Sequence, residues 1–169
     1  MFFWILFLLI ATQRLIELWI AKRNTERLLS LGAQEFGRSH YWLLVSIHTL
    51  FFLSLLVEFL YRGHTRSEFW LPLLTIFIFA QAVRVWVIGS MKGRWTTRIL
   101  AIKGERLVHS GPFSLFSHPN YAIVCIEILV LPLIFNLFTT AIVFSLLNAF
   151  ALLFVRIPVE EKALAWIQS

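Results

Sequence analysis

The chain alternates between long apolar runs and short polar segments. Five apolar runs cover Phe2–Ile20, Tyr41–Tyr61, Phe69–Ser90, Tyr121–Phe135 and Leu137–Val155. A helix needs about 20 apolar residues to cross about 30 Å of hydrocarbon, and the first three runs reach this length. The pattern predicts an all-α integral membrane bundle of about five transmembrane helices.

The last two runs are separated only by Asn136. A single helix from Pro119 to Val155 would be about 55 Å long at the usual rise per residue, which is too long for a bilayer. We therefore expect a helical hairpin that turns near Asn136, followed by a short cytoplasmic helix at the C-terminus. The segment Ala21–His40 mixes charges with leucines, and either an amphipathic helix on the membrane surface or a solvated connector fits it equally.

Composition supports a membrane protein with a single domain over residues 1–169. The chain is 59% hydrophobic and only 14% charged, and its mean hydropathy is +0.80, whereas soluble domains have about 25% charged residues. The one cysteine, Cys125, excludes an internal disulfide and a zinc site built from several cysteines. We expect no bound metal.

The net charge of +6 would suit a protein that binds nucleic acid. The charges lie between the apolar runs, however, as expected for the loops of a membrane protein. Most Lys and Arg residues lie in the segments after the first run, after the third run and at the C-terminus: Lys22, Arg23, Arg27, Arg38, Lys92, Arg94, Arg98, Lys103, Arg106, Arg156 and Lys162. The segment between the second and third runs has only Arg62 and Arg66. The positive-inside rule then places the N-terminus outside and the C-terminus in the cytoplasm.

A first polar island contains His118, Pro119 and Tyr121. Proline is favoured at the first position of a helix, so we expect a helix to begin at Pro119 with His118 at its cap. The free backbone N–H groups of such a helix end attract anions, and both side chains would address one small ligand there. On spacing alone, a helix start with Tyr121 in an interfacial aromatic belt is the simpler explanation.

A second island contains Arg156, Pro158, Glu160 and Glu161. Pro158 indicates another helix start, and acidic residues in a first turn stabilise a helix by about 0.3–1 kcal/mol. That role accounts for both glutamates without any ligand. The glycine-rich basic segments 93–98 and 103–111 fit either close backbone approach to a ligand or contact with anionic lipid headgroups.

Charged residues inside the expected spans include Arg14, Glu17, Arg84 and Glu127. Each costs about 2.5–3.5 kcal/mol in the bilayer centre, so such residues normally face the bundle interior and form pairs. Arg14 and Glu17 share a helix face and can pair. We expect Arg84 to extend toward the cytoplasmic interface, whereas Glu127 has no partner nearby in the sequence.

Taken in order, these segments resemble the isoprenylcysteine carboxyl methyltransferase family. The matching residues are Leu107, Val108 and Gly111, then His118, Pro119 and Tyr121, and, after a helical hairpin, Arg156, Ile157, Glu160, Glu161 and Leu164. The resemblance covers roughly the C-terminal half, with the motifs in residues 92–169. Three positions differ from the family: Glu105 replaces a His, Phe113 a Tyr and Ser117 an Arg.

The resemblance implies a membrane methyltransferase that uses S-adenosylmethionine. By this likeness His118, Pro119, Tyr121 and Glu161 would contact the cofactor, together with the backbone around Leu107, Val108 and Gly111. Arg156 and Glu160 would be the catalytic residues, at the junction of cofactor and acceptor. The Ser117 difference favours a lipophilic small-molecule acceptor, methylated on a carboxylate, enol or hydroxyl oxygen, over a prenylated protein.

Two other functions remain open at this point. One is N-methylation of a phospholipid or other lipid amine. The other is a non-catalytic transport or scaffold subunit. A transporter needs polar residues near the bilayer midplane, where Glu127 is the main candidate, whereas the polar islands lie at one face and favour the enzyme.

Overall fold

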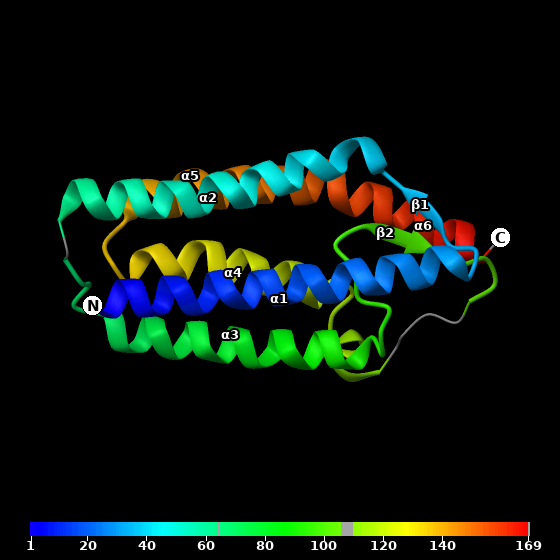
Figure 1. Ribbon diagram of the computed structural model, residues 1–169, viewed down its shortest axis with the longest axis horizontal. Coiled ribbons are helices and arrows are strands. Elements are labelled where there is room, and N and C mark those ends of the chain that lie inside the picture. The colour runs from blue at the N-terminus through cyan, green and yellow to red at the C-terminus, as the bar shows by residue number, and fades with distance from the viewer. Residues whose placement is uncertain (64, 106–109, 169) are drawn as a thin grey trace.

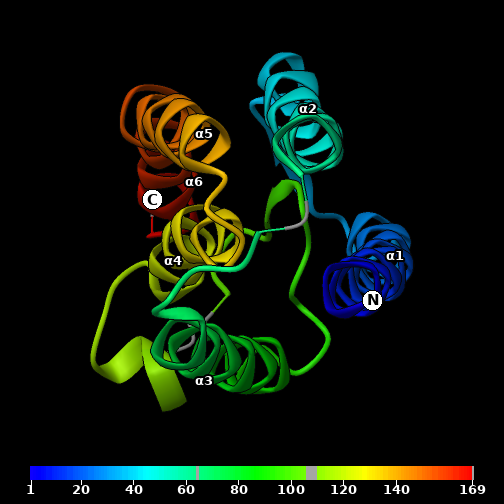
Figure 2. The same cartoon turned by 90° about the vertical axis from the view of Figure 1, so that its left-hand side faces the viewer.

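The computed structural model describes residues 1–63, 65–105 and 110–168. Its elements are α1 (Phe2–Ser30), β1 (Gln34–Phe36), η1 (Arg38–His40), α2 (Tyr41–Arg62), α3 (Trp70–Ser90), β2 (Ile99–Ala101), η2 (Gly111–Ser114), α4 (Pro119–Leu133), α5 (Phe138–Ala151), η3 (Leu152–Arg156) and α6 (Ile157–Gln168). Helices α1 to α5 run lengthwise beside one another, whereas β1, β2 and α6 gather at one end (Figure 1; Figure 2 views the bundle end-on). The expectation of an all-α bundle is confirmed, with one small sheet added.

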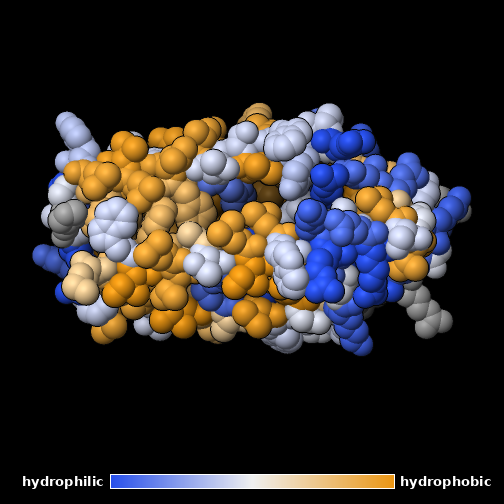
Figure 3. All heavy atoms as spheres, viewed as in Figure 1, coloured by the Kyte–Doolittle hydropathy of each residue, from blue (hydrophilic) through white to orange (hydrophobic). Residues whose placement is uncertain are grey.

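Within the described residues, four helical stretches are long and apolar enough to cross a membrane: Phe2–Ser30, Arg38–Arg62, Trp70–Ser90 and Phe138–Gln168. The helix Pro119–Leu133 is apolar but shorter. Hydrophobic side chains cover most of the bundle, and hydrophilic ones gather at the end that holds β1, β2 and α6 (Figure 3). These features indicate a multi-pass membrane protein.

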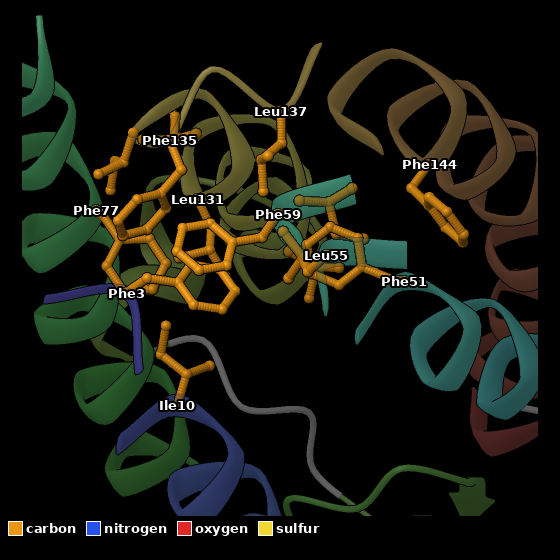
Figure 4. Close-up of a cluster of buried hydrophobic side chains, with 14 of the residues drawn as sticks. Phe3, Ile10, Phe51, Leu55, Phe59, Phe77, Leu131, Phe135, Leu137 and Phe144 are labelled. Atoms are coloured by element: carbon orange, nitrogen blue, oxygen red, sulfur yellow. The ribbon is translucent and has the colours of Figure 1, made fainter. Parts of the chain in front are cut away.

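Aromatic side chains join the helices (Figure 4) at the opposite end of the bundle, where α1 begins and α2 ends (Figure 1). The ring of Phe3 on α1 stacks on that of Phe59 on α2, with centroids 3.5 Å apart, and meets Phe135 edge-on at 5.0 Å. Lipid tails are as apolar as these rings, so the hydrophobic effect does not hold such helices together. Close packing and dispersion between the rings do so instead.

The predicted hairpin near Asn136 is confirmed. Asn136 adopts a left-handed backbone conformation, φ 57°, which Asn tolerates better than most residues. The Glu58 carboxylate then accepts hydrogen bonds from the backbone N–H groups of Thr139 (3.2 Å) and Thr140 (2.7 Å) at the start of α5. Because the chain reverses here, the start of α4 and the end of α5 lie at the same end of the bundle.

Of the two alternatives for Ala21–His40, a separate surface helix is wrong. Helix α1 continues to Ser30, because residues 22–30 contain good helix formers and neither Gly nor Pro. The chain then turns at Gly32, φ 87°, into β1, which pairs antiparallel with β2. Three-residue strands leave too little alternation for the sequence to reveal them.

The helix start expected at Pro158 is confirmed to within one residue, since α6 begins at Ile157 with Glu160 in its first turn, but no break precedes it. The chain stays helical from α5 through the π-helical turn η3, Leu152–Arg156, into α6. Proline cannot donate to the carbonyl one turn earlier, and a π turn changes the hydrogen-bond register at such a point. Arg156 is the last residue of this turn.

Charged side chains of α1, α3 and α4 form one buried network within the bundle. Arg84 donates to Glu17 (Nε to Oε1, 2.9 Å) and to Glu127 (Nη1 to Oε2, 2.6 Å). Arg14 pairs with the same two carboxylates: its Nη1 lies 2.5 Å from Oε2 of Glu17, and its Nη2 lies 2.8 Å from Oε2 of Glu127. Glu127 therefore finds its partners on other helices, and the expectation that Arg84 reaches the interface is wrong, since Arg84 is only 6% exposed.

We predict that Arg84→Leu lowers the free energy of unfolding by about 3–5 kcal/mol, because Glu17 and Glu127 lose a shared buried partner. Arg62→Leu removes a half-exposed partner of Glu58 and should cost under about 1 kcal/mol. Reversible unfolding in mixed micelles measures both. Equal losses in the two variants would show that the network contributes no more than a surface ion pair.

Candidate functional site

The two polar islands meet at the hydroxyl group of Tyr121. This hydroxyl donates a short hydrogen bond to Oε2 of Glu160 and accepts one from Nε of Arg156 at 3.0 Å. Tyr121 lies in the first turn of α4, Arg156 at the end of η3 and Glu160 in the first turn of α6. Four of the residues expected from the sequence, His118 included, thus form one cluster.

His118 lies flat against Tyr121, with ring centroids 5.3 Å apart and an interplanar angle of 15°. Its Nδ1 is 3.8 Å from Oε1 of Glu160, which is too long for a hydrogen bond. This buried Nδ1 and the buried Oδ1 of Asn120 lack hydrogen-bond partners among the described residues. Buried polar atoms are nearly always paired, so a polar ligand at this site is a natural partner for the Nδ1 of His118.

Helix α4 begins at Pro119 with His118 as its N-cap, as the sequence predicts. The anion site expected at this helix end has fewer free backbone N–H donors than anticipated. Pro119 has no N–H group, and the N–H groups of Tyr121 and Ala122 are already bonded to the carbonyl of His118. Side chains rather than helix-end N–H groups therefore dominate the chemistry here.

Glu161 follows Glu160 on α6 and is exposed, so its carboxylate is accessible from water. Gly111 begins η2, and it has a packing role: its φ is +66°, and a Cβ there would collide with the side chain of Ser90 on α3. Leu107 and Val108, also expected at the site, lie outside the described residues.

A small cavity beside Arg156 adds residues that the sequence did not point to. Tyr41 at the start of α2 and Ile99 on β2 line it together with Gly37 and Val159. Gly37 has no room for a side chain, since a Cβ would lie 2.7 Å from Val159. These residues come from separate segments without a shared motif, and Asn120 was overlooked inside the first island.

The cluster offers a mixed set of charges to a ligand. Glu160 and Glu161 are carboxylates that suit an ammonium group or hydroxyls, and the Arg156 guanidinium suits a carboxylate. Only the Nε of Arg156 is bonded to Tyr121, and a guanidinium has further donors. The cluster therefore suits a cationic or hydroxyl-bearing group beside the glutamates and an anionic group beside Arg156.

The fold and this cluster define a small multi-pass membrane protein with a polar site at one end of its bundle. The chain matches the isoprenylcysteine carboxyl methyltransferase (ICMT) family over residues 73–166, and it belongs to that family. It is 41% identical over 162 residues to the uncharacterized protein YpbQ of Bacillus subtilis (strain 168), covering 96% of both chains. An uncharacterized protein of Haemophilus influenzae is 30% identical, over 95% of this chain and 94% of its own. No solved structure matches the chain.

We predict that Gly111→Ala lowers the free energy of unfolding by about 1–3 kcal/mol more than Gly104→Ala. Both glycines have positive φ, but a Cβ at Gly104 meets nothing within 4 Å, so the comparison isolates the clash with Ser90. Thermal unfolding in detergent measures the difference. The same loss in both variants would mean that η2 is not tightly packed on α3.

Proposed function

We propose that this protein is an S-adenosylmethionine-dependent methyltransferase that methylates an oxygen atom of a lipophilic acceptor at the cytoplasmic membrane interface. The observation that supports this most is the cluster of His118, Tyr121, Arg156 and Glu160. These residues come from the two separated motifs that the family match spans. Family membership makes methyl transfer the first reaction to test.

When bound, S-adenosylmethionine would supply a methyl group on a cationic sulfur, and that sulfur would leave as a neutral thioether when the acceptor oxygen takes the methyl group. Its amino acid end is a zwitterion, and its ribose has two hydroxyls. Glu161 with the His118 and Tyr121 pair would hold it, and the unpaired Nδ1 of His118 fits its polar groups. Gly111, Pro119 and the segment with Leu107 and Val108 would form the backbone wall of the same site.

Arg156 and Glu160 would act on the acceptor. An acceptor carboxylate or enolate is already nucleophilic, and the permanently charged guanidinium of Arg156 would hold it. A hydroxyl acceptor needs a base, and Glu160 is placed for that role. Oε2 of Glu160 accepts a hydrogen bond from the Tyr121 hydroxyl, so Oε1 is the oxygen available to take a proton from the acceptor.

The position of the cluster explains why such an enzyme is a membrane protein. The cluster lies at the hydrophilic end of the bundle (Figure 3), where we place the cytoplasm from the distribution of Lys and Arg, with the N-terminus outside. A water-soluble methyl donor reaches this end from the cytoplasm, and an apolar acceptor reaches it from the bilayer. Alignment of donor and acceptor lowers the activation barrier by several kcal/mol.

We predict that Glu161→Ala weakens S-adenosylmethionine binding at least tenfold, because a carboxylate partner of the ligand is lost. Glu26→Ala, at an exposed glutamate on α1, should bind like the wild type. Isothermal titration calorimetry of the protein in detergent measures both. Absence of binding to the wild-type protein would refute the proposed function, and wild-type affinity in Glu161→Ala would remove this residue from the site.

We predict that Arg156→Ala lowers turnover by at least a hundredfold and changes cofactor affinity little, because Arg156 acts on the acceptor in the transition state. Lys162→Ala removes an exposed positive charge six residues further along the chain, on α6, and should stay active. The assay uses a methyl-labelled donor with total lipid extract, and the labelled lipid identifies the acceptor. Unchanged product formation in Arg156→Ala would exclude it from the chemistry.

A further inference from the structure

A groove of about 710 Å³ runs along the membrane-facing side of α1 and α3. Its α1 wall extends from Ile5 to Ile20, which corresponds to about 22 Å of helix. Val85 on α3 lines the other side, and Thr12, Gln13 and Glu17 are the polar residues among those that line it. The groove is thus mainly apolar, with a polar patch partway along its floor.

The polar patch is the edge of the buried ion network. Glu17 is saturated, since it accepts hydrogen bonds from Gln13, Arg14 and Arg84. Gln81 donates its amide N–H to Glu127 (2.7 Å), and Gln13 donates its own to Gln81 (2.8 Å) and to Glu17 (2.8 Å). Each contact has an oxygen as acceptor, so the two carboxylates fix the orientation of both amides.

This orientation leaves the side-chain carbonyl oxygen of Gln13, Oε1, as an acceptor without a donor among the described residues. It accepts no hydrogen bond from any part of the chain that the structure describes. Lipid tails offer no donors, and an unsatisfied polar group facing hydrocarbon is costly. A ligand with a hydrogen-bond donor removes that cost, whereas an ordinary acyl chain does not.

The depth of Gln13 restricts the ligand further. Gln13 lies nine residues before Lys22 on α1, or about 13 Å below the basic boundary of the bundle. A phospholipid headgroup stays at that boundary, and the groove continues for eight residues beyond Gln13 to Ile5. The donor must therefore lie near the middle of an apolar chain.

We propose that the α1–α3 groove is a binding site for an apolar chain with a hydroxyl group near its middle, which donates a hydrogen bond to the carbonyl oxygen of Gln13. The apolar arms lie along α1 in both directions, toward Ile5 and toward Ile20. The site goes beyond the proposed methyl transfer, since none of its residues belongs to the His118 and Tyr121 cluster.

Native mass spectrometry of the detergent-solubilised protein tests this with two matched probes. Diheptyl carbinol has two apolar arms and a central hydroxyl, whereas diheptyl ketone has the same arms and no donor. We expect one bound carbinol per chain and about tenfold weaker binding of the ketone, the difference made by one hydrogen bond. Equal occupancy by both probes, or carbinol binding that does not saturate at one molecule, would overturn the proposal.

Three variants locate the site. Gln13→Leu should lower carbinol binding to the level of the ketone, and Val85→Trp should fill the groove and abolish binding of both. Val85 is exposed, so this variant keeps the comparison valid if Gln13→Leu does not fold. Thr75→Leu removes an exposed hydroxyl of α3 that bonds its own helix, and it should bind both probes like the wild type. Unchanged carbinol binding in Gln13→Leu or in Val85→Trp would exclude the groove.

Discussion

The hydroxyl group of Tyr121 joins two parts of the chain that are separated by a complete helical hairpin. It bonds Arg156, 35 residues away, and Glu160, 39 residues away. Such a contact requires the chain to leave one end of the bundle and return to it. The turn at Asn136 and the capping of α5 by Glu58 make that return possible, so the site depends on features at the opposite end of the molecule.

Two kinds of interaction hold the bundle together where the hydrophobic effect does not. Stacked rings around Phe3 join the helices near one end. The network of Arg14, Glu17, Arg84 and Glu127 joins α1 to α3 and α4 between these rings and the site. Glu127 lies six residues beyond Tyr121 on α4, about 9 Å along the helix. The network therefore fixes the helix that presents Tyr121 to the second motif. Its edge at Gln13 also gives the outer groove a polar floor.

The sequence predicted the helices, the hairpin and the membrane character because each depends on long apolar runs or on a local breaker such as Asn136. It also pointed to His118, Tyr121, Arg156 and Glu160, since proline-marked helix ends and the family resemblance select them. It missed what depends on contacts between distant segments. The partners of Glu127, the pairing of β1 with β2 and the cavity beside Arg156 leave no local pattern. The π turn before Pro158 was missed because proline alone indicates a break and not a change of hydrogen-bond register.

The contact between the two motifs is tested most directly by cross-linking across it. In a Cys125→Ser background, the pair Tyr121→Cys and Glu160→Cys should be joined by a short bifunctional maleimide, because the two side chains touch in the structure. The pair Asn136→Cys and Glu160→Cys should not be joined, since Asn136 lies at the far end of α4. Efficient cross-linking of the first pair alone is the predicted result. No cross-linking of the first pair in folded protein, or equal cross-linking of both, would contradict a site built from the two motifs.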